Sequence, residues 1–144
     1  LHKEYRRQRQ MCIRDRSCFE VEDFLYPQAK RLMAYISQRY QGSIEYLWDR
    51  SPNSGAIRHR KTLKWYGVFM TIDWKKLDTG KSGKIEVLNV KANQAADLIH
   101  EKGIYPAFHM NKKYWVSIPL DDSLTDEELF ALVDTSWQLT KKGT

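Results

Sequence analysis

The hydrophobic period changes several times along this chain, and that change limits the folds it can adopt more than any other feature. From Ala29 to Tyr40, and again from Leu129 to Trp137, apolar residues recur every three or four positions, which predicts amphipathic helices. Shorter runs between these segments, such as 65–72, alternate with a period of two, as strands do when one face is buried. The sequence therefore predicts helices packed on a sheet.

The order of these periods predicts one α+β domain. Gly42 is expected to close the first helix, and Thr125 and Glu128 form a capping box that opens the last one. Asn93 is expected to cap a short middle helix. In order, we predict helix, three strands, helix, two strands and helix, at residues 27–42, 57–60, 65–72, 85–91, 93–103, 105–110, 114–120 and from 125 onward. The strands form two hairpins and an antiparallel sheet that carries its helices on one face.

Alternation within the strands assigns their side chains to the two faces of the sheet. One face is expected to lie under the helices and to carry Tyr66, Val68, Met70, Ile72, Val116, Ile118 and Leu120. The opposite face is expected to mix aromatic, basic and polar side chains, namely Arg58, Arg60, Trp65, Phe69, Thr71, Asn89, Lys91, His109, Trp115 and Ser117.

That mixed face indicates binding to nucleic acid. Aromatic rings can stack on bases, which is worth about 1–3 kcal/mol per base, and cations neutralise phosphates. A purely structural interpretation is also open, in which Trp65 and Trp115 pack together across the strands beneath arginine stems.

The connections within the two hairpins are basic. Arg58, Arg60, Lys61 and Lys64 surround the first connection, and Lys112 and Lys113 lie in the second. A pair of strands can enter a DNA groove and touch phosphates on either side with its tip. Lysines at turns also serve solubility and protect sheet edges.

The net charge of +6 supports nucleic-acid binding less than it first suggests. Residues 1–18 contain six Lys and Arg against two acidic residues, so residues 19–144 hold only two of the six net positive charges. The segment 1–18 has almost no apolar pattern and is expected to be a disordered or foreign tail, or alternatively a basic arm along phosphate. We expect the domain itself to span 19–144.

No motif in the sequence points to catalysis, a metal or a cofactor. Cys12 and Cys18 lack the paired spacing of a zinc site, and the histidines show no spacing typical of metal ligands. Gly80-Lys81-Ser82 leads into a strand, not into the helix that a phosphate-binding loop needs. No apolar run approaches the roughly 18 residues of a membrane helix, and no secretory signal is visible. We expect a cytoplasmic, non-enzymatic protein without cofactor or metal that does not bind membranes.

Three stretches carry a more specific pattern. They are Lys-Trp-Tyr-Gly-Val-Phe-Met at 64–70, Leu-Asn-Val-Lys-Ala at 88–92 and Pro-Ala-Phe-His-Met-Asn-Lys-Lys-Tyr-Trp-Val at 106–116. With the ending at 128–139, these stretches resemble the MmcQ/YjbR family of bacterial proteins, and the resemblance spans 27–140. It implies a CyaY-like α+β fold with helices on one face of an antiparallel sheet. It also implies DNA binding through the two hairpins, arranged as a double wing.

CyaY-like folds also include the frataxins, which bind iron through acidic residues on the first helix. In this chain the helix at 28–41 carries Lys30, Arg31 and Arg39 and no carboxylate, so ligands for a hard cation are missing there. Carboxylates that suit the N-terminus of the last helix are Asp121, Asp122, Asp126, Glu127 and Glu128.

The leading hypothesis is a small DNA-binding protein. Its candidate contacts are Arg58, Arg60, Lys61, Lys64, Trp65, Lys91, His109, Lys112, Lys113 and Trp115. Two alternatives stay open. One is a protein-interaction module with a protein partner on the aromatic face, and the other is a small-molecule binder or enzyme in which His109, Asn89 and Lys91 line a pocket.

Overall fold

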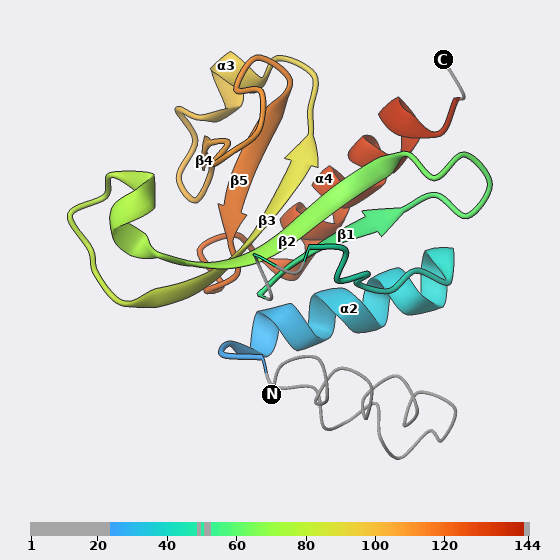
Figure 1. The fold of residues 1–144 in the computed structure, drawn as a ribbon. Coiled ribbons are helices and arrows are strands. Elements are labelled where there is room, and N and C mark those ends of the chain that lie inside the picture. Colours follow the sequence, from blue (N-terminus) through green and yellow to red (C-terminus); the bar gives the residue numbers. More distant parts are fainter. Residues whose placement is uncertain (1–23, 49, 51–52, 143–144) are drawn as a thin grey trace.

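The computed structural model describes residues 24–48, 50 and 53–142, so the tail predicted at 1–18 lies outside the described residues. The elements are α2 (Pro27–Tyr40), β1 (Ser54–Arg58), β2 (Trp65–Asp73), the 3-10 helix η2 (Trp74–Leu77), β3 (Lys84–Lys91), α3 (Ala95–Leu98), β4 (Tyr105–Pro106), β5 (Trp115–Pro119) and α4 (Asp126–Thr140) (Figure 1). The predicted order of three helices and five strands is confirmed for this part of the chain. None of its helices is long and apolar enough to cross a bilayer.

The strands form one antiparallel sheet in the order β1-β2-β3-β5-β4. The helices α2 and α4 lie on one face of this sheet (Figure 1). Their buried side chains, which include Leu32 and Leu129, join one apolar cluster with Leu88 and Ile118 of the sheet. All four side chains are withdrawn from water, which is worth about 1.5–3 kcal/mol for each. The predicted α+β class with an antiparallel sheet is therefore confirmed.

The start of α4 and the end of α2 are capped in different ways. The predicted capping box is present, since the Thr125 N–H donates to Glu128 Oε1 (2.9 Å) and the Glu128 N–H donates to Thr125 Oγ1 (3.1 Å). At the other end of the core, α2 is closed by Gln41, which has a left-handed φ of 53°, and not by Gly42. A side chain at Gly42 is excluded for another reason, because its Cβ would lie 2.5 Å from Tyr66 Oη.

The residue that precedes the short helix α3 as its N-cap is Gln94 and not Asn93, so the predicted cap is wrong. Gln94 has a φ of 55° and makes no hydrogen bond to the helix with its side chain. The chain has to turn sharply after β3 ends at Lys91, and the left-handed residue makes that turn. Asn93 is exposed to solvent.

A β-bulge interrupts the pairing of β1 with β2. Ile57 pairs with Gly67, and the next residue, Arg58, pairs with Trp65. Tyr66 is therefore an extra residue on β2, opposite no residue of β1. An extra residue shifts the alternation of side chains by one position. Beyond the bulge, each side chain of β2 therefore points to the face opposite to the one that uninterrupted alternation would give.

This bulge makes most of the predicted face assignment of β2 wrong. Tyr66 does join the cluster under the helices, and Phe69 joins it as well. Val68, Met70 and Ile72 belong to a second cluster on the opposite face. The prediction assumed that 65–72 is an uninterrupted strand. The bulge arises from the pairing of β2 with β1, and the sequence pattern of 65–72 alone does not indicate that pairing.

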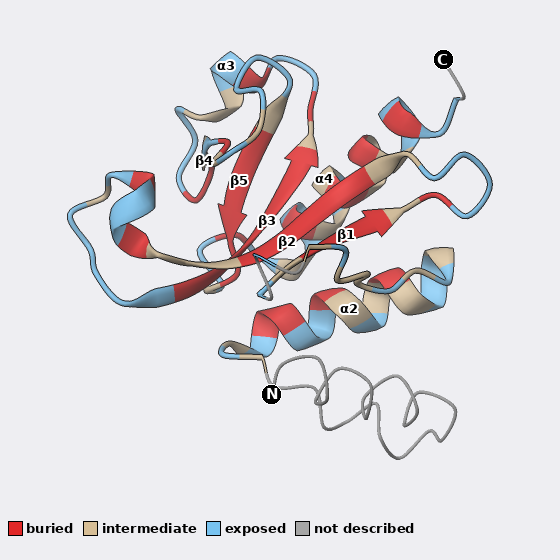
Figure 2. Ribbon diagram, viewed as in Figure 1, coloured by how far each residue is buried: buried red, intermediate tan, exposed pale blue. Residues whose placement is uncertain are grey.

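The helix-free face of the sheet is not open along its whole length. Its second cluster is built from Val68, Met70, Trp74, Leu77, Ile85 and Val87. The helix η2 folds over one end of this cluster, and Tyr105 and Phe108 pack against it from the segment before β5. Buried residues run along the central strands, while the hairpin connections are largely exposed (Figure 2). Among the described residues, the exposed ones near this face gather at the hairpin connections (Figure 2).

The strand β4 covers only Tyr105–Pro106, shorter than the predicted 105–110. Beyond it, side-chain hydrogen bonds replace the strand ladder. The Phe108 N–H donates to Ser117 Oγ (2.9 Å), and Asn89 Nδ2 donates to the Phe108 carbonyl (2.9 Å). Ser117 Oγ in turn donates to Asn89 Oδ1 (2.5 Å). This network fastens the segment after β4 to the centre of the sheet.

A buried carboxylate anchors the start of α2. Glu86 on β3 is 2% exposed, and its Oε1 accepts a hydrogen bond from the Tyr26 N–H at 2.9 Å. Burial raises the pKa of Glu86, and hydrogen bonds from the backbone of Leu25 and Tyr26 oppose that rise. The folded protein therefore binds this proton more tightly than the unfolded chain does.

We expect Glu86→Gln to become more stable relative to the parent as pH rises. The raised pKa means that the Glu86 contribution to stability falls as pH rises through the folded-state pKa. Glutamine keeps an acceptor oxygen without the buried charge. Denaturant unfolding at about pH 4 and about pH 8, below and above the ordinary glutamate pKa of about 4.3, measures the difference. The exposed Glu101→Gln is the control, and the same pH trend in both variants would contradict the assignment.

Candidate nucleic-acid interface

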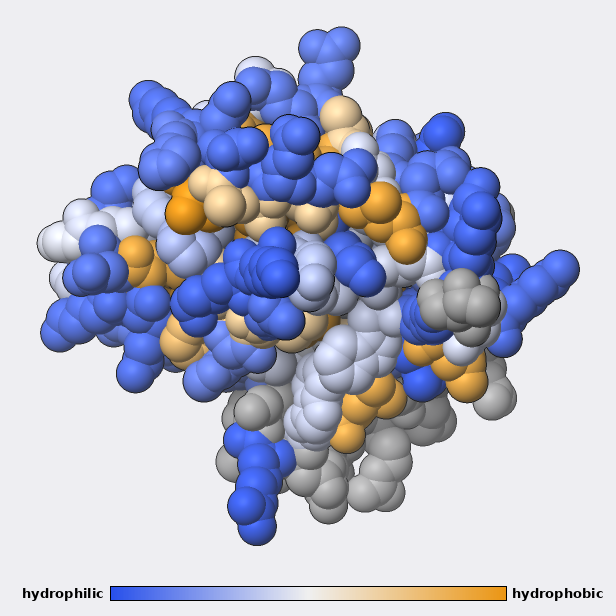
Figure 3. Space-filling model, turned by 90° about the horizontal axis from the view of Figure 1, so that it is seen from above, coloured by the Kyte–Doolittle hydropathy of each residue, from blue (hydrophilic) through white to orange (hydrophobic). Residues whose placement is uncertain are grey.

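One end of the sheet forms a shallow groove of about 370 Å³. It lies where β2 begins, β3 ends and β5 begins, so both hairpin connections flank it. Its lining residues are Leu63, Lys64, Trp65, Lys91, Trp115, Leu139 and Thr140. This end of the molecule, seen in Figure 3, shows hydrophilic side chains around scattered hydrophobic ones. Four of the ten predicted contacts, Lys64, Trp65, Lys91 and Trp115, thus come together from three strands or their ends.

The two tryptophans of the groove do not form the pair considered from the sequence. The Trp65 ring meets Trp48 edge to face, with centroids 5.3 Å apart. Strand β3 lies between β2 and β5, which separates Trp65 from Trp115 by two strand spacings, or about 10 Å. Lys91 of β3 pairs with Trp115 and occupies the intervening strand. The result is a row of ring, cation and ring across the end of the sheet.

A serine from α4 fixes the floor of this groove. Ser136 is fully buried, and its Oγ donates to the Tyr66 carbonyl (2.6 Å) and accepts from the Lys91 N–H (2.9 Å). Tyr66 is the bulge residue, so α4 satisfies a carbonyl at the break in the β1–β2 ladder. The same hydroxyl positions the backbone of two groove strands.

The basic residues at the first hairpin connection have two different environments. Arg58 is held by Glu45, with Nη2 2.5 Å from Oε1 and Nε 3.1 Å from Oε2, so the guanidinium already has a carboxylate partner. Arg60 and Lys61 are exposed and line a neighbouring pocket instead of the groove. Leu63 turns the chain back toward β2 with a φ of 64° and exposes 54% of its surface.

His59 belongs to the core and not to the exposed surface. Its Nε2 lies 2.7 Å from Thr140 Oγ1, and that hydroxyl donates its one hydrogen to the Ser136 carbonyl (2.8 Å). The His59 ring must therefore donate from Nε2. Burial, with a smaller effect from Lys64, lowers the pKa of His59, which keeps the ring neutral at pH 7. Among the described residues, no three His, Cys, Asp or Glu side chains gather as a metal site requires.

The second connection presents its lysines to solvent. Asn111 Oδ1 accepts from the Lys113 N–H at 2.9 Å, which shapes a tight turn that exposes both Lys112 and Lys113. His109 is also exposed, with a φ of 61°, and its ring rests against Phe108 at 3.9 Å. Asn89 is fully buried beneath this segment, so it is withdrawn from any ligand. Neither His109 nor Asn89 lines the groove or the neighbouring pocket.

Sequence reasoning missed the contribution of the helix ends. Leu139 and Thr140 of α4 complete the groove, and Lys141 and Lys142, which follow α4, line the neighbouring pocket with Arg39 of α2. The consecutive lysines were visible in the sequence. Their place beside the first hairpin was not, because it depends on how α4 crosses the sheet.

The family model YjbR matches residues 40–139, a span that contains every residue of the groove except Thr140. The chain belongs to the YjbR family. The Bacillus subtilis protein YyaQ is 32% identical over 112 residues, which cover 76% of this chain and 95% of YyaQ. The protein YjbR of Escherichia coli strain K12 is 36% identical over 47 residues, or 31% of this chain and 40% of that protein.

Solved structures show the same YjbR-family fold. A crystal structure of a Pseudomonas syringae protein is 29% identical, superposes with a TM-score of 0.74, and covers 77% of this chain and 97% of its own. The Deinococcus radiodurans protein DR2400, with a DUF419 domain, is 22% identical with a TM-score of 0.59, over 81% of this chain and 80% of its own. At that identity DR2400 supports the fold alone.

Proposed function

We propose that this YjbR-family protein is a non-enzymatic DNA-binding protein that contacts phosphates through the end of the sheet. The observation that carries the proposal is the groove, where Lys64 and Lys91 lie beside Trp65 and Trp115 and none of the described lining residues is a carboxylate. Neither lysine forms an ion pair with a described residue. These cations beside half-buried rings match what a nucleic-acid strand offers, which is phosphate charge and flat bases.

The hairpin connections extend this surface on both sides. Arg60 and Lys61 lie at the first connection, and Lys112 and Lys113 at the second, all exposed. Because both connections flank the same end of the sheet, their cations can reach phosphates on either side of a bound strand or groove. Their positions support the double-wing binding that the family resemblance implies.

The carboxylates at the start of α4 lie away from this surface. Asp122 and Asp126 surround the start of α4, where both pair with Arg31 of α2. The helix α4 runs from there to the groove, where its last turn supplies Leu139 and Thr140. These carboxylates therefore lie at the end of α4 that is away from the groove, where they do not repel an anionic partner at close range.

We expect loss of the exposed lysines to weaken binding to duplex DNA of every sequence. Each phosphate contact contributes about 0.9 to the slope of log affinity against log salt, so Lys112→Ala/Lys113→Ala should lower that slope by up to about two. Lys64→Ala/Lys91→Ala should do the same if the groove holds DNA. A fluorescence anisotropy titration over several salt concentrations measures both variants.

The matched control is Lys75→Ala/Lys76→Ala. It removes the same charge from exposed positions on η2, at the opposite end of β2. The proposal predicts an unchanged salt slope for this control. Equal slopes for the parent and for both double variants of the binding surface would refute it.

A second candidate function is a protein-interaction module on the same groove. Leu63 and Leu139, which line the groove, are 54% and 37% exposed, and exposed leucines contribute little to phosphate binding. Under this function, capture of a partner protein would survive nuclease treatment and would be lost in Leu63→Ser/Leu139→Ser. Under the DNA proposal, the same double variant keeps the salt slope of the parent.

A further inference from the structure

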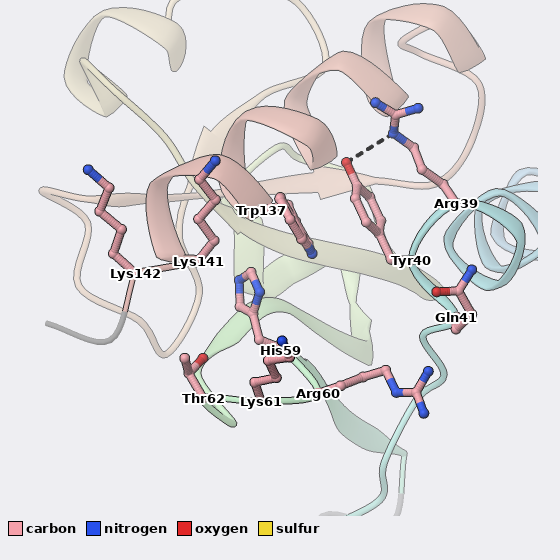
Figure 4. Close-up of a pocket in the computed structure, with 10 residues that line it drawn as sticks. All are labelled: Arg39, Tyr40, Gln41, His59, Arg60, Lys61, Thr62, Trp137, Lys141 and Lys142. Carbon is pink, nitrogen blue, oxygen red and sulfur yellow. Dashed lines mark hydrogen bonds between the residues drawn. The ribbon is translucent and has the colours of Figure 1, made fainter.

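A second hollow lies beside the groove, on the other side of the first hairpin connection. It has a volume of about 540 Å³, within the range of about 300–1,000 Å³ that small-molecule sites usually occupy. The end of α2, the 59–62 turn and the end of α4 form its walls (Figure 4). These three segments are far apart in the sequence, so only the fold assembles the pocket.

The pocket contains a stack of two aromatic rings. Tyr40 and Trp137 stack with centroids 4.9 Å apart and planes 15° apart. On the other side of the indole lies Lys141, with its Nζ 5.8 Å from the ring centroid (Figure 4). Lys141 is an exposed side chain that can swing aside at little cost. A flat ring of a ligand could then take its place on Trp137.

Several cations line this pocket, and most of them have no carboxylate partner among the described residues. Arg60, Lys61, Lys141 and Lys142 line the pocket, and none of them forms an ion pair with a described residue. Arg39 also lines it but is paired with Asp134 at 3.2 Å. Two helices end here, and the partial negative charge of their last carbonyls, about half a unit each, offsets only part of the four unpaired positive charges.

The aromatic side chains at the bottom of the pocket, its floor, favour a ligand that has a flat ring as well as negative charge. His59 is neutral and held by Thr140, and its ring lies 5.1 Å from Trp137. The floor is thus aromatic and fixed, whereas the rim is flexible and cationic. A free inorganic anion would contact only the cations of the rim. An uncharged ring would contact only the aromatic floor.

We propose that this pocket binds a nucleoside phosphate. The base stacks on Trp137 at the position of Lys141, and the phosphate lies beside Lys142, which is on the same side of the indole as Lys141 (Figure 4). The ligand is a free nucleotide or the phosphorylated end of a nucleic-acid strand, which present the same chemistry. The inference goes beyond the DNA-binding proposal and does not depend on it, because Trp137, Lys141 and Lys142 take no part in the proposed DNA surface.

Calorimetric titration of the full chain with adenosine 5′-monophosphate, adenosine and inorganic phosphate tests the site. We expect the nucleotide to bind at least about tenfold more tightly than adenosine or phosphate, because only the nucleotide uses both floor and rim. Lys141→Ala/Lys142→Ala changes exposed side chains beyond the last helical turn, so it should fold normally. It should weaken nucleotide binding about tenfold, whereas the control Lys75→Ala/Lys76→Ala should not change it.

A second pair of probes identifies the source of the ligand. A short single-stranded oligonucleotide is titrated with a 5′-phosphate and with a 5′-hydroxyl. Nucleotide binding that depends on Lys141 and Lys142, with no effect of the oligonucleotide phosphate, supports a free nucleotide. Tighter binding of the phosphorylated strand, lost in the same variant, supports a strand end. Equal affinity for nucleotide and phosphate, or no effect of the variant on any probe, overturns the proposal. Either result leaves the salt-slope test of the groove unaffected.

Discussion

The variant Ser136→Ala is expected to lower the free energy of unfolding by about 2–4 kcal/mol. Its hydroxyl donates to the Tyr66 carbonyl and accepts from the Lys91 N–H in a fully buried site. Alanine would leave both backbone groups without a partner where water cannot replace the hydroxyl. Each buried group left unpaired costs about 1–3 kcal/mol, and the better helix propensity of alanine recovers only a few tenths.

Denaturant unfolding of parent and variant measures this loss. The control is Thr135→Ala, one position earlier on α4, where a half-buried side chain makes no hydrogen bond to a described residue. Hydrogen exchange adds a local readout, since the Lys91 amide should lose protection before the centre of β3 does. A destabilisation of Ser136→Ala no larger than that of the control would contradict this role.

The second large effect is expected for Asn89→Ala, again about 2–4 kcal/mol. Asn89 is fully buried, donates to the Phe108 carbonyl and accepts from Ser117 Oγ. Truncation leaves two polar groups unpaired and creates a small cavity. The consequence is also functional, because this network fastens the segment that presents Lys112 and Lys113.

Limited proteolysis and the DNA salt titration together test this second prediction. We expect cleavage within 107–114 to become faster and DNA affinity to fall, although no contact residue has changed. Asn93→Ala, at an exposed position just after β3, should match the parent in both measurements. Equal protease resistance of Asn89→Ala and Asn93→Ala would show that the network does not hold the segment.

The two long helices, and the start of the last one, followed closely from local patterns. The capping box at Thr125 and Glu128 formed as predicted, because capping needs only residues three positions apart. The long strands were also predicted in the right places. The error at Asn93 has a local cause of a different kind, since a left-handed turn at Gln94 overrode the usual preference for asparagine as a cap.

The candidate site was predicted in part. Lys64, Trp65, Lys91 and Trp115 were selected from alternation and composition, and the fold places them in one groove. Arg58 and Asn89 have the expected chemistry, but the first is paired with Glu45 and the second is buried. Residue type alone cannot tell a free cation from a paired one, because the partner comes from another segment of the chain.

By itself the sequence determined the kind, order and approximate position of the elements, because hydrophobic period and capping act over a few residues. It also determined which residue types stand at the hairpin connections. Only the tertiary structure decided which face each side chain of β2 occupies, since the bulge at Tyr66 arises from its pairing with β1. The tertiary structure likewise joined the ends of α2 and α4 to the first hairpin, because such contacts depend on the packing of whole elements across the sheet.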